Sequence, residues 1–88
     1  MEIQLKLYGS SQLLSDEKTL PIKLPKNSNI KKLRDKLGKI ISNKNYQSNL
    51  TSLHKTAAFF SDKNEIIDDN YKLKDKELIS IIPPIGGG

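Results

Sequence analysis

A single helical stripe, in a chain otherwise patterned for strands, most limits what these 88 residues can fold into. Between residues 30 and 41 the apolar side chains lie three or four positions apart, which places them on one face of a helix. They are Ile30, Leu33, Leu37 and Ile40 or Ile41. Ser28 or Asn29 can cap this helix, which is expected to end near Asn43. A chain of this length forms one domain, so its one long helix must cover one face of one sheet.

Short segments with alternating or continuous apolar residues predict the strands. Residues 3–7 and 20–24 alternate with a period of two, and residues 55–60, 66–67 and 78–82 are short apolar runs. Pro21 and Pro25 lack an N–H, so the second strand is expected at a sheet edge. A helical turn is expected around Leu13 and Leu14, while residues 45–53 indicate only a short helix or a loop. The order of elements predicts an α+β fold.

The last predicted strand is apolar on both sides. Ile79 and Ile81 fall on one side, and Leu78 and Ile82 fall on the other. One helix covers only one face of a sheet, so the second side needs a cover from loops or from a partner. We favour a partner, since exposed apolar patches on small domains often mark protein contacts.

The side chains offer little catalytic chemistry. Cysteine is absent, which excludes disulfides, thiolate metal sites and a cysteine nucleophile. The one histidine, His54, has no HxxxH or HExxH spacing, so no metal site is predicted and a surface or loop histidine is the simpler interpretation. The acidic pair Asp68 and Asp69 is interpreted as a solvated turn. An ordinary enzyme is therefore not expected.

The formal net charge of +5 fits nucleic acid, an acidic partner, or simply a lysine-coated surface. The helix lysines are not interleaved with aromatic residues that could stack on bases, so nucleic acid is not the expected partner. They are Lys31, Lys32, Lys36, Lys39 and Lys44. We interpret them as the solvated face of the helix and as an electrostatic guide for an acidic partner. Without a signal-peptide pattern or an apolar run of ~20 residues, we expect a cytoplasmic protein with no membrane partner.

The end of the chain carries the clearest chemical signal. It consists of Pro83, Pro84, Ile85, Gly86, Gly87 and Gly88. The prolines are expected to hold this segment extended, the isoleucine is an apolar anchor, and the glycines lack a Cβ and so fit a narrow channel. We therefore expect a domain over residues 1–82 and an extended tail over residues 83–88. The expected reactive group is the C-terminal carboxylate of Gly88, which must be activated, typically as an acyl-adenylate made from ATP, before a nucleophile can displace AMP.

These features resemble the β-grasp, ubiquitin-like sulfur carriers, most closely the small subunits of molybdopterin synthase. Residues 81–88 (IIPPIGGG) match that family's F-F-P-P-V-x-G-G ending, and residues 73–77 (LKDKE) match its L-x-D-G-D turn. Residues 30–34 (IKKLR) are similar to its V-x-x-L-R helix signature. Phe60 replaces a frequent asparagine, and Lys76 replaces the glycine of the turn. The resemblance implies a mixed sheet of four to five strands packed on one main helix.

The resemblance also implies a carrier that is not catalytic alone. An adenylyltransferase of the ubiquitin-activating type, using ATP and magnesium, would adenylate Gly88. A sulfur donor, either a sulfurtransferase or a cysteine desulfurase, would then make the thiocarboxylate. Within a heterotetramer, the tail would enter the large synthase subunit and donate sulfur to a cyclic pterin phosphate precursor, a step of molybdenum cofactor biosynthesis. Ile82, Leu78 and Phe60 are the expected docking residues, and no cofactor is expected on this chain itself.

Other functions remain open at this stage. Within the same fold, the chain could carry sulfur for thiamine biosynthesis or tRNA thiolation, or be a ubiquitin-like modifier joined to lysines. Pro83 and Pro84 favour the molybdopterin branch. From a different class, the positive charge permits a small nucleic-acid-binding domain, which would bind DNA or RNA in a salt-sensitive way without its glycines.

Overall fold

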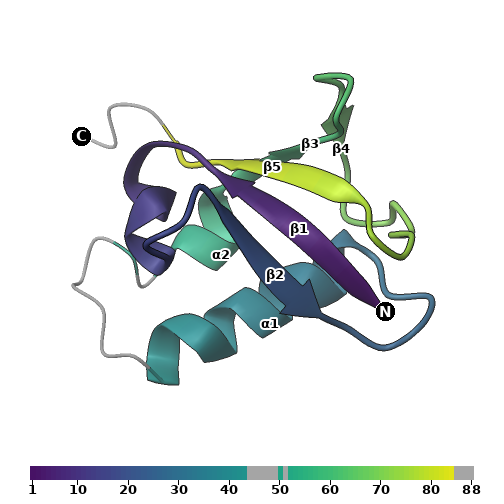
Figure 1. Ribbon diagram of the computed structural model, residues 1–88, viewed down its shortest axis with the longest axis horizontal. Helices are drawn as coiled ribbons and strands as arrows, with labels where there is room; N and C mark the ends of the chain where they lie inside the picture. The colour runs from purple at the N-terminus through teal and green to yellow at the C-terminus, as the bar shows by residue number, and fades with distance from the viewer. Residues whose placement is uncertain (44–49, 51, 85–88) are drawn as a thin grey trace.

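The computed structural model describes residues 1–43, 50 and 52–84 (Figure 1). Its elements follow one another as β1 (Glu2–Leu7), the 3-10 helix η1 (Gly9–Leu14), β2 (Thr19–Lys23), α1 (Ile30–Asn43), α2 (Leu53–Thr56), β3 (Ala58–Phe60), β4 (Ile66–Ile67) and β5 (Leu78–Ile82). Within this part of the chain, no helix has both the length and the apolar character needed to cross a bilayer.

The five strands form one mixed sheet in the order β2-β1-β5-β3-β4. β1 and β5 are parallel, and the other neighbouring pairs are antiparallel. β5 therefore lies at the centre of the sheet, and β2 lies at an edge, as Pro21 within it and Pro25 just after it predict. Figure 1 shows α1 running across one face of this sheet. The β-grasp architecture expected from the sequence is confirmed.

The hydrophobic core lies between α1 and the sheet. Every residue of the predicted helical stripe is buried, and at its end Ile41 is 4% exposed while Ile40 is only partly buried. The sheet contributes fully buried side chains from its central strands, namely Ile3, Leu5, Phe59, Ile79 and Ile81. Burial of each large aliphatic side chain stabilises the fold by about 1.5–3 kcal/mol. The stripe thus fixes which face of α1 meets the sheet.

Of the two expected capping residues, Asn29 caps α1. Its Oδ1 accepts a hydrogen bond from the backbone N–H of Lys32 at 3.0 Å. Ser28 is buried and instead donates its hydroxyl to the carbonyl of Pro25 at 2.7 Å. Ser28 therefore closes the turn before the helix and leaves the cap to its neighbour.

The third strand begins later than the sequence predicts. Lys55 and Thr56 belong to α2, and the N–H of Ala57 donates to the carbonyl of Leu53 at 3.0 Å. Because Leu53 and Ala57 lie four residues apart, one helical turn buries both side chains. The prediction of a strand from residue 55 is wrong for this reason, and β3 starts at Ala58. The helical turn expected near Leu14 is confirmed as η1.

Candidate functional site

The face of the sheet opposite α1 exposes apolar side chains at its centre. Along β5, Ile79 and Ile81 are fully buried, whereas Leu78 is 37% exposed and Ile82 is partly buried. This alternation confirms that the last strand is apolar on two sides. The helix covers one side, and the second side faces away from it.

The strand register brings the three predicted docking residues together. Phe60 pairs with Ser80, which lies between Leu78 and Ile82 on the same face of β5, and Ala58 pairs with Ile82. We call these five residues the sheet patch. Ser80 is only 8% exposed because the larger side chains flank it. Leu78, Ile82 and Phe60 thus form one apolar surface over two neighbouring strands.

Polar groups on β1 border the sheet patch. Gln4 lies opposite Leu78, and Lys6 lies opposite Ser80. The Lys6 ammonium stands 5.4 Å from the centre of the Tyr8 ring, and Tyr8 itself is 39% exposed. An apolar centre with a polar rim is the usual anatomy of a protein interface. Tyr8 was missed by sequence reasoning, although it continues the outward-facing positions of β1.

The start of the tail is held against the domain. Pro83 follows β5 and packs beside Gly9, where a Cβ would lie 3.7 Å from the proline ring. Gly9 has a φ of 56°, a conformation that favours glycine. The Ser11 hydroxyl accepts the N–H of Tyr8 and donates to its carbonyl, which stabilises this corner. The exit direction of the chain from β5 is therefore defined as far as Pro83.

Most of the predicted tail lies outside the described residues. Ile85, Gly86, Gly87 and Gly88 belong to this part of the chain, as do Lys44 and most of residues 45–53. The expected chemistry at Gly88 therefore stays a prediction. The placement of β5 and Pro83 shows only where the tail begins.

The turn before β5 ties that strand to β1. The Asp75 carboxylate accepts the N–H of Glu2 at 2.9 Å, and the N–H of Lys76 donates to the Glu2 carbonyl at 2.6 Å. Lys76 has a φ of 67°. It stands at the position that is glycine in the L-x-D-G-D turn of the family that the sequence resembles. The Tyr71 hydroxyl donates to the carboxylate of Glu77, and this hydrogen bond, with a smaller contribution from burial, raises the pKa of Tyr71 to about 12. The family-like turn thus sets the register of β5.

The arginine of the helix signature holds β3 and the following loops in place. Arg34 donates to the carbonyls of His54 and Ala57 at 3.2 and 2.8 Å and forms an ion pair with Asp69 at 2.8 Å. Its guanidinium lies 4.8 Å from the centre of the Phe59 ring. Arg34 therefore positions the strand whose other face carries Phe60.

His54 and the acidic pair have structural surroundings. His54 lies partly buried on α2, with its ring against Gly38, so it belongs to neither an open surface nor a loop. The Asp68 carboxylate accepts the N–H of Asn70, which confirms a turn, and Asp69 pairs with Arg34. Among the described residues, no three His, Asp or Glu side chains gather in a group suited to a metal ion.

Comparison with known proteins identifies relatives by structure alone. No protein-family model matches the chain, and no curated protein matches it in sequence. SAMP1 from Haloferax volcanii superposes with a TM-score of 0.68 at 12% identity, with 100% of both chains covered. A putative molybdopterin converting factor subunit 1 from Pyrococcus furiosus superposes with a TM-score of 0.66 at 14% identity, covering 96% of this chain and 98% of that one.

A third structure has a similar fold and a higher sequence identity to this chain than the two structures above. It is a chain from the complex of subunits 1 and 2 of the molybdopterin-converting factor from Helicobacter pylori 26695. It has a TM-score of 0.62 and 26% identity, with 100% of both chains covered. The resemblance drawn from the sequence is thus confirmed in structure: the chain is similar to molybdopterin converting factor subunits and to SAMP1 over its whole β-grasp fold.

Proposed function

We propose that this chain is a sulfur carrier of the molybdopterin synthase small-subunit type. In this proposal the Gly88 carboxylate is adenylated, converted to a thiocarboxylate, and used to donate sulfur to a cyclic pterin phosphate precursor. The full-length similarity to a chain of the Helicobacter pylori complex, at 26% identity, is the observation that carries it. The Pro-Pro-Ile-Gly-Gly-Gly sequence directly after the central strand supports it.

The reactive group of the proposed carrier is the main-chain carboxylate of Gly88 and not a side chain. Attack of the Gly88 carboxylate on ATP gives the acyl-adenylate and releases pyrophosphate. Sulfide then displaces AMP and gives the thiocarboxylate directly; if the donor is a persulfide, its outer sulfur displaces AMP and a second thiol of the donor cleaves the resulting acyl disulfide, which releases the thiocarboxylate and leaves the donor as a disulfide. The chain contains no cysteine, so none of its own side chains offers a competing thiol. ATP and magnesium belong to the activating enzyme in this scheme.

The described residues fix the point at which the tail leaves the domain. β5 is hydrogen-bonded on both sides, and Pro83 rests beside Gly9, so the tail starts from a defined point. The five residues that follow Pro83 can extend by at most about 18 Å. The reacting centre of a partner must therefore lie within that distance of Pro83 when the two proteins dock.

The sheet patch is the proposed docking surface for the large synthase subunit. Leu78, Ile82 and Phe60 supply its apolar centre, and the polar groups of β1 supply its rim. The Helicobacter pylori structure is itself a complex of two subunits, which supports a large-subunit partner. Because β5 carries both the patch and the tail, docking there orients the tail as well.

The decisive test is intact-mass analysis after incubation with a competent activating enzyme, ATP and a sulfur donor. We expect a single oxygen-to-sulfur exchange, mapped to a C-terminal Gly88 by fragmentation. An unchanged mass, or an exchange elsewhere, contradicts the proposal. A C-terminal tag should abolish the exchange because it blocks the carboxylate, whereas an N-terminal tag should leave it intact.

A ubiquitin-like modifier is the second candidate, and its tail chemistry begins in the same way. The Haloferax volcanii relative is described as a small archaeal modifier protein, and its 10–12% identity supports the fold alone. A modifier would transfer its activated glycine to a lysine amine, so target proteins would gain the mass of the whole chain. Pull-down of a large synthase subunit, rather than a thiazole synthase, separates the molybdopterin pathway from thiamine biosynthesis.

A further inference from the structure

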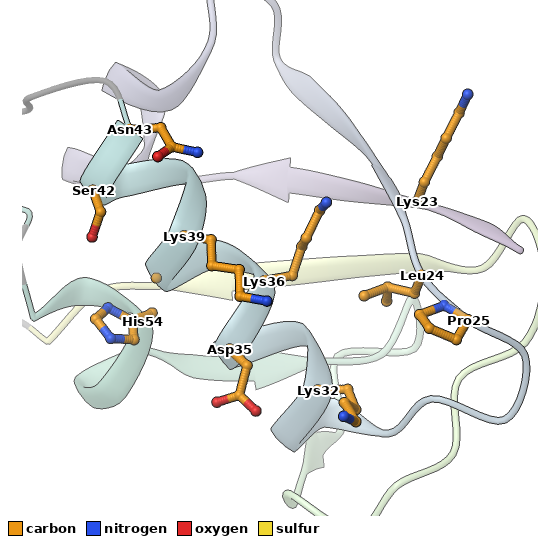
Figure 2. Close-up of a pocket in the computed structure, with 11 residues that line it drawn as sticks. Lys23, Leu24, Pro25, Lys32, Asp35, Lys36, Lys39, Ser42, Asn43 and His54 are labelled. Carbon is orange, nitrogen blue, oxygen red and sulfur yellow. The ribbon is translucent and has the colours of Figure 1, made fainter.

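A groove runs along α1 (Figure 2), the helix that covers the face of the sheet opposite the sheet patch. Its volume is about 800 Å³. It lies between the helix and the segment that leaves β2, and His54 of α2 also borders it. We call it the α1 groove. The proposed sulfur-carrier function does not use this surface.

Lysines dominate the walls of the α1 groove. Lys32, Lys36 and Lys39 lie at helical spacing along one side of α1, and Lys23 at the end of β2 adds a fourth ammonium group. Asp35 is the only acidic residue of the lining. Within the described part of the chain, none of these four lysines forms an ion pair. Like charges one helical turn apart destabilise a helix by about 0.2–0.5 kcal/mol per pair, so an anionic ligand would relieve this repulsion.

The floor of the groove is less polar than its walls. Leu24 is 6% exposed and Pro25 is exposed beside it, which gives the groove an apolar end near β2. Gly38 has no side chain, and the His54 ring packs against it. A ligand that combines carboxylates with an apolar group fits this lining better than a bare anion does.

We propose that the α1 groove binds an acidic segment of a partner protein. Lysines one turn apart on a helix lie about 5–6 Å from each other at Cβ, and alternate side chains of an extended peptide lie about 7 Å apart. Glutamates or aspartates at alternate positions therefore match the lysine stripe. An apolar residue of the same segment contacts Leu24 and Pro25.

A polypeptide fits the groove better than a nucleic acid. Among the residues that line the groove there is no Phe, Tyr or Trp, and the one ring, that of His54, packs against Gly38, so bases have little to stack on. Asp35 also stands among the lysines and repels a continuous line of phosphates. A polypeptide can place a neutral or basic residue opposite Asp35, which a phosphate backbone cannot do.

The position of the groove permits two partners at once. α1 and the sheet patch occupy opposite faces of the sheet, so an acidic segment bound in the α1 groove leaves Leu78 and Ile82 uncovered. This inference goes beyond the proposed function and does not depend on sulfur transfer.

Fluorescence anisotropy tests the proposal with a short labelled peptide that has glutamate at alternate positions and leucine at one end. The groove variant is Lys32→Glu, Lys36→Glu and Lys39→Glu combined. The matched control is Lys18→Glu, Lys63→Glu and Lys74→Glu, which changes the net charge equally at exposed lysines outside the α1 groove. We expect the groove variant to lose at least about tenfold in affinity, the control to lose about threefold or less, and wild-type binding to weaken as salt rises.

Several outcomes overturn the proposal. The first is that the wild-type chain does not bind the peptide. The second is that the groove variant and the control lose peptide affinity equally. The third is that an oligonucleotide of the same charge binds to the same lysines more tightly than the peptide does. Amide shifts on wild-type protein provide a check that does not depend on whether a variant folds. Peptide-induced shifts in α1 and Leu24 support the groove, whereas shifts confined to the sheet patch contradict it.

Discussion

The ring of His54 occupies the space that a side chain at Gly38 would need. A Cβ on Gly38 would lie 2.9 Å from Cδ2 of His54 and 3.0 Å from its Nε2. Glycine inside a helix costs about 1 kcal/mol relative to alanine, so its presence in α1 needs a reason. Close approach of α1 and α2 supplies that reason.

Gly38→Ala is therefore expected to destabilise the protein by about 1–3 kcal/mol despite the better helix propensity of alanine. In a His54→Ala background the same change should instead stabilise by about 1 kcal/mol, because the obstructing ring is gone. Urea unfolding of the four proteins in this cycle measures both effects. A Gly38→Ala variant that is more stable than wild type contradicts the contact.

Lys76→Gly is expected to stabilise the protein by about 0.5–1 kcal/mol. Lys76 has a φ of 67°, which a residue with a Cβ adopts at a cost and glycine adopts freely. The hydrogen bond from its N–H to Glu2 is retained. Chemical denaturation measures the change, and Lys74→Gly in the same turn, with no such strain, should destabilise. Equal effects at the two positions would argue against strain at Lys76.

The hydrogen bond between Tyr71 and Glu77 should give stability a dependence on alkaline pH. The folded pKa of Tyr71, about 12, lies above the unfolded value of about 10. A raised pKa favours the protonated phenol in the folded state, so its contribution is complete below pH 10 and is lost as pH rises through 12. Tyr71→Phe should lack this component of the pH profile, as measured by denaturation at a series of pH values.

Phenolate absorbance gives an independent check on the same pair. Glu77→Gln removes the carboxylate charge, so the pKa of Tyr71 should fall toward its ordinary value. Each folded protein is titrated and compared with its Tyr71→Phe counterpart, which isolates the signal of this tyrosine. An unchanged Tyr71 titration in Glu77→Gln contradicts the assigned cause.

Arg34→Ala is expected to cost about 2–4 kcal/mol in the free energy of unfolding. It removes the donor to the carbonyls of His54 and Ala57 and the guanidinium that stacks on Phe59. Arg34→Lys should rescue little, since an ammonium lacks the planar fork. Asp69→Asn, which removes only an exposed partner, should cost about 1 kcal/mol or less. Similar losses in Arg34→Ala and Asp69→Asn would show that the ion pair dominates.

Ile82→Glu and Leu78→Glu should each weaken binding to a large synthase subunit by at least about tenfold while the domain stays folded. The reason is that each places a carboxylate in the apolar centre of the sheet patch. Calorimetry with the purified subunit measures the affinity, and circular dichroism checks folding. Leu13→Glu is the matched control because Leu13 is 57% exposed on η1 and belongs to neither of the two strands that carry the patch. Unchanged affinity in the patch variants would place the interface elsewhere.

The sequence correctly predicted the elements whose apolar residues recur with a clear period. It failed where the apolar run was too short to show a period. The stripe of α1 and the two-sided β5 follow directly from apolar spacing. The start of β3 was placed too early because a run of six residues does not distinguish a strand from a helical turn. Phe60 and Ile82 were selected separately, and only the register showed that they share a surface.

The α1 groove illustrates a second limit of sequence reasoning. The sequence alone predicts that the helix lysines form a solvated face and that they guide an acidic partner by electrostatic attraction. Lys23 belongs to a different element, and its place beside those lysines depends on the packing of β2 against β1 and of α1 beneath the sheet. Such a meeting of distant residues has no local pattern that could have predicted it.

The parallel pairing of β1 with β5 has a mechanical consequence. β1 starts at one end of the sheet and β5 finishes at the opposite end, so traction applied through the tail and resisted at the N-terminus slides the two strands along each other. Sliding loads all of their hydrogen bonds together, whereas peeling would break them one at a time. The domain is therefore expected to resist a pull applied through the residues that follow β5.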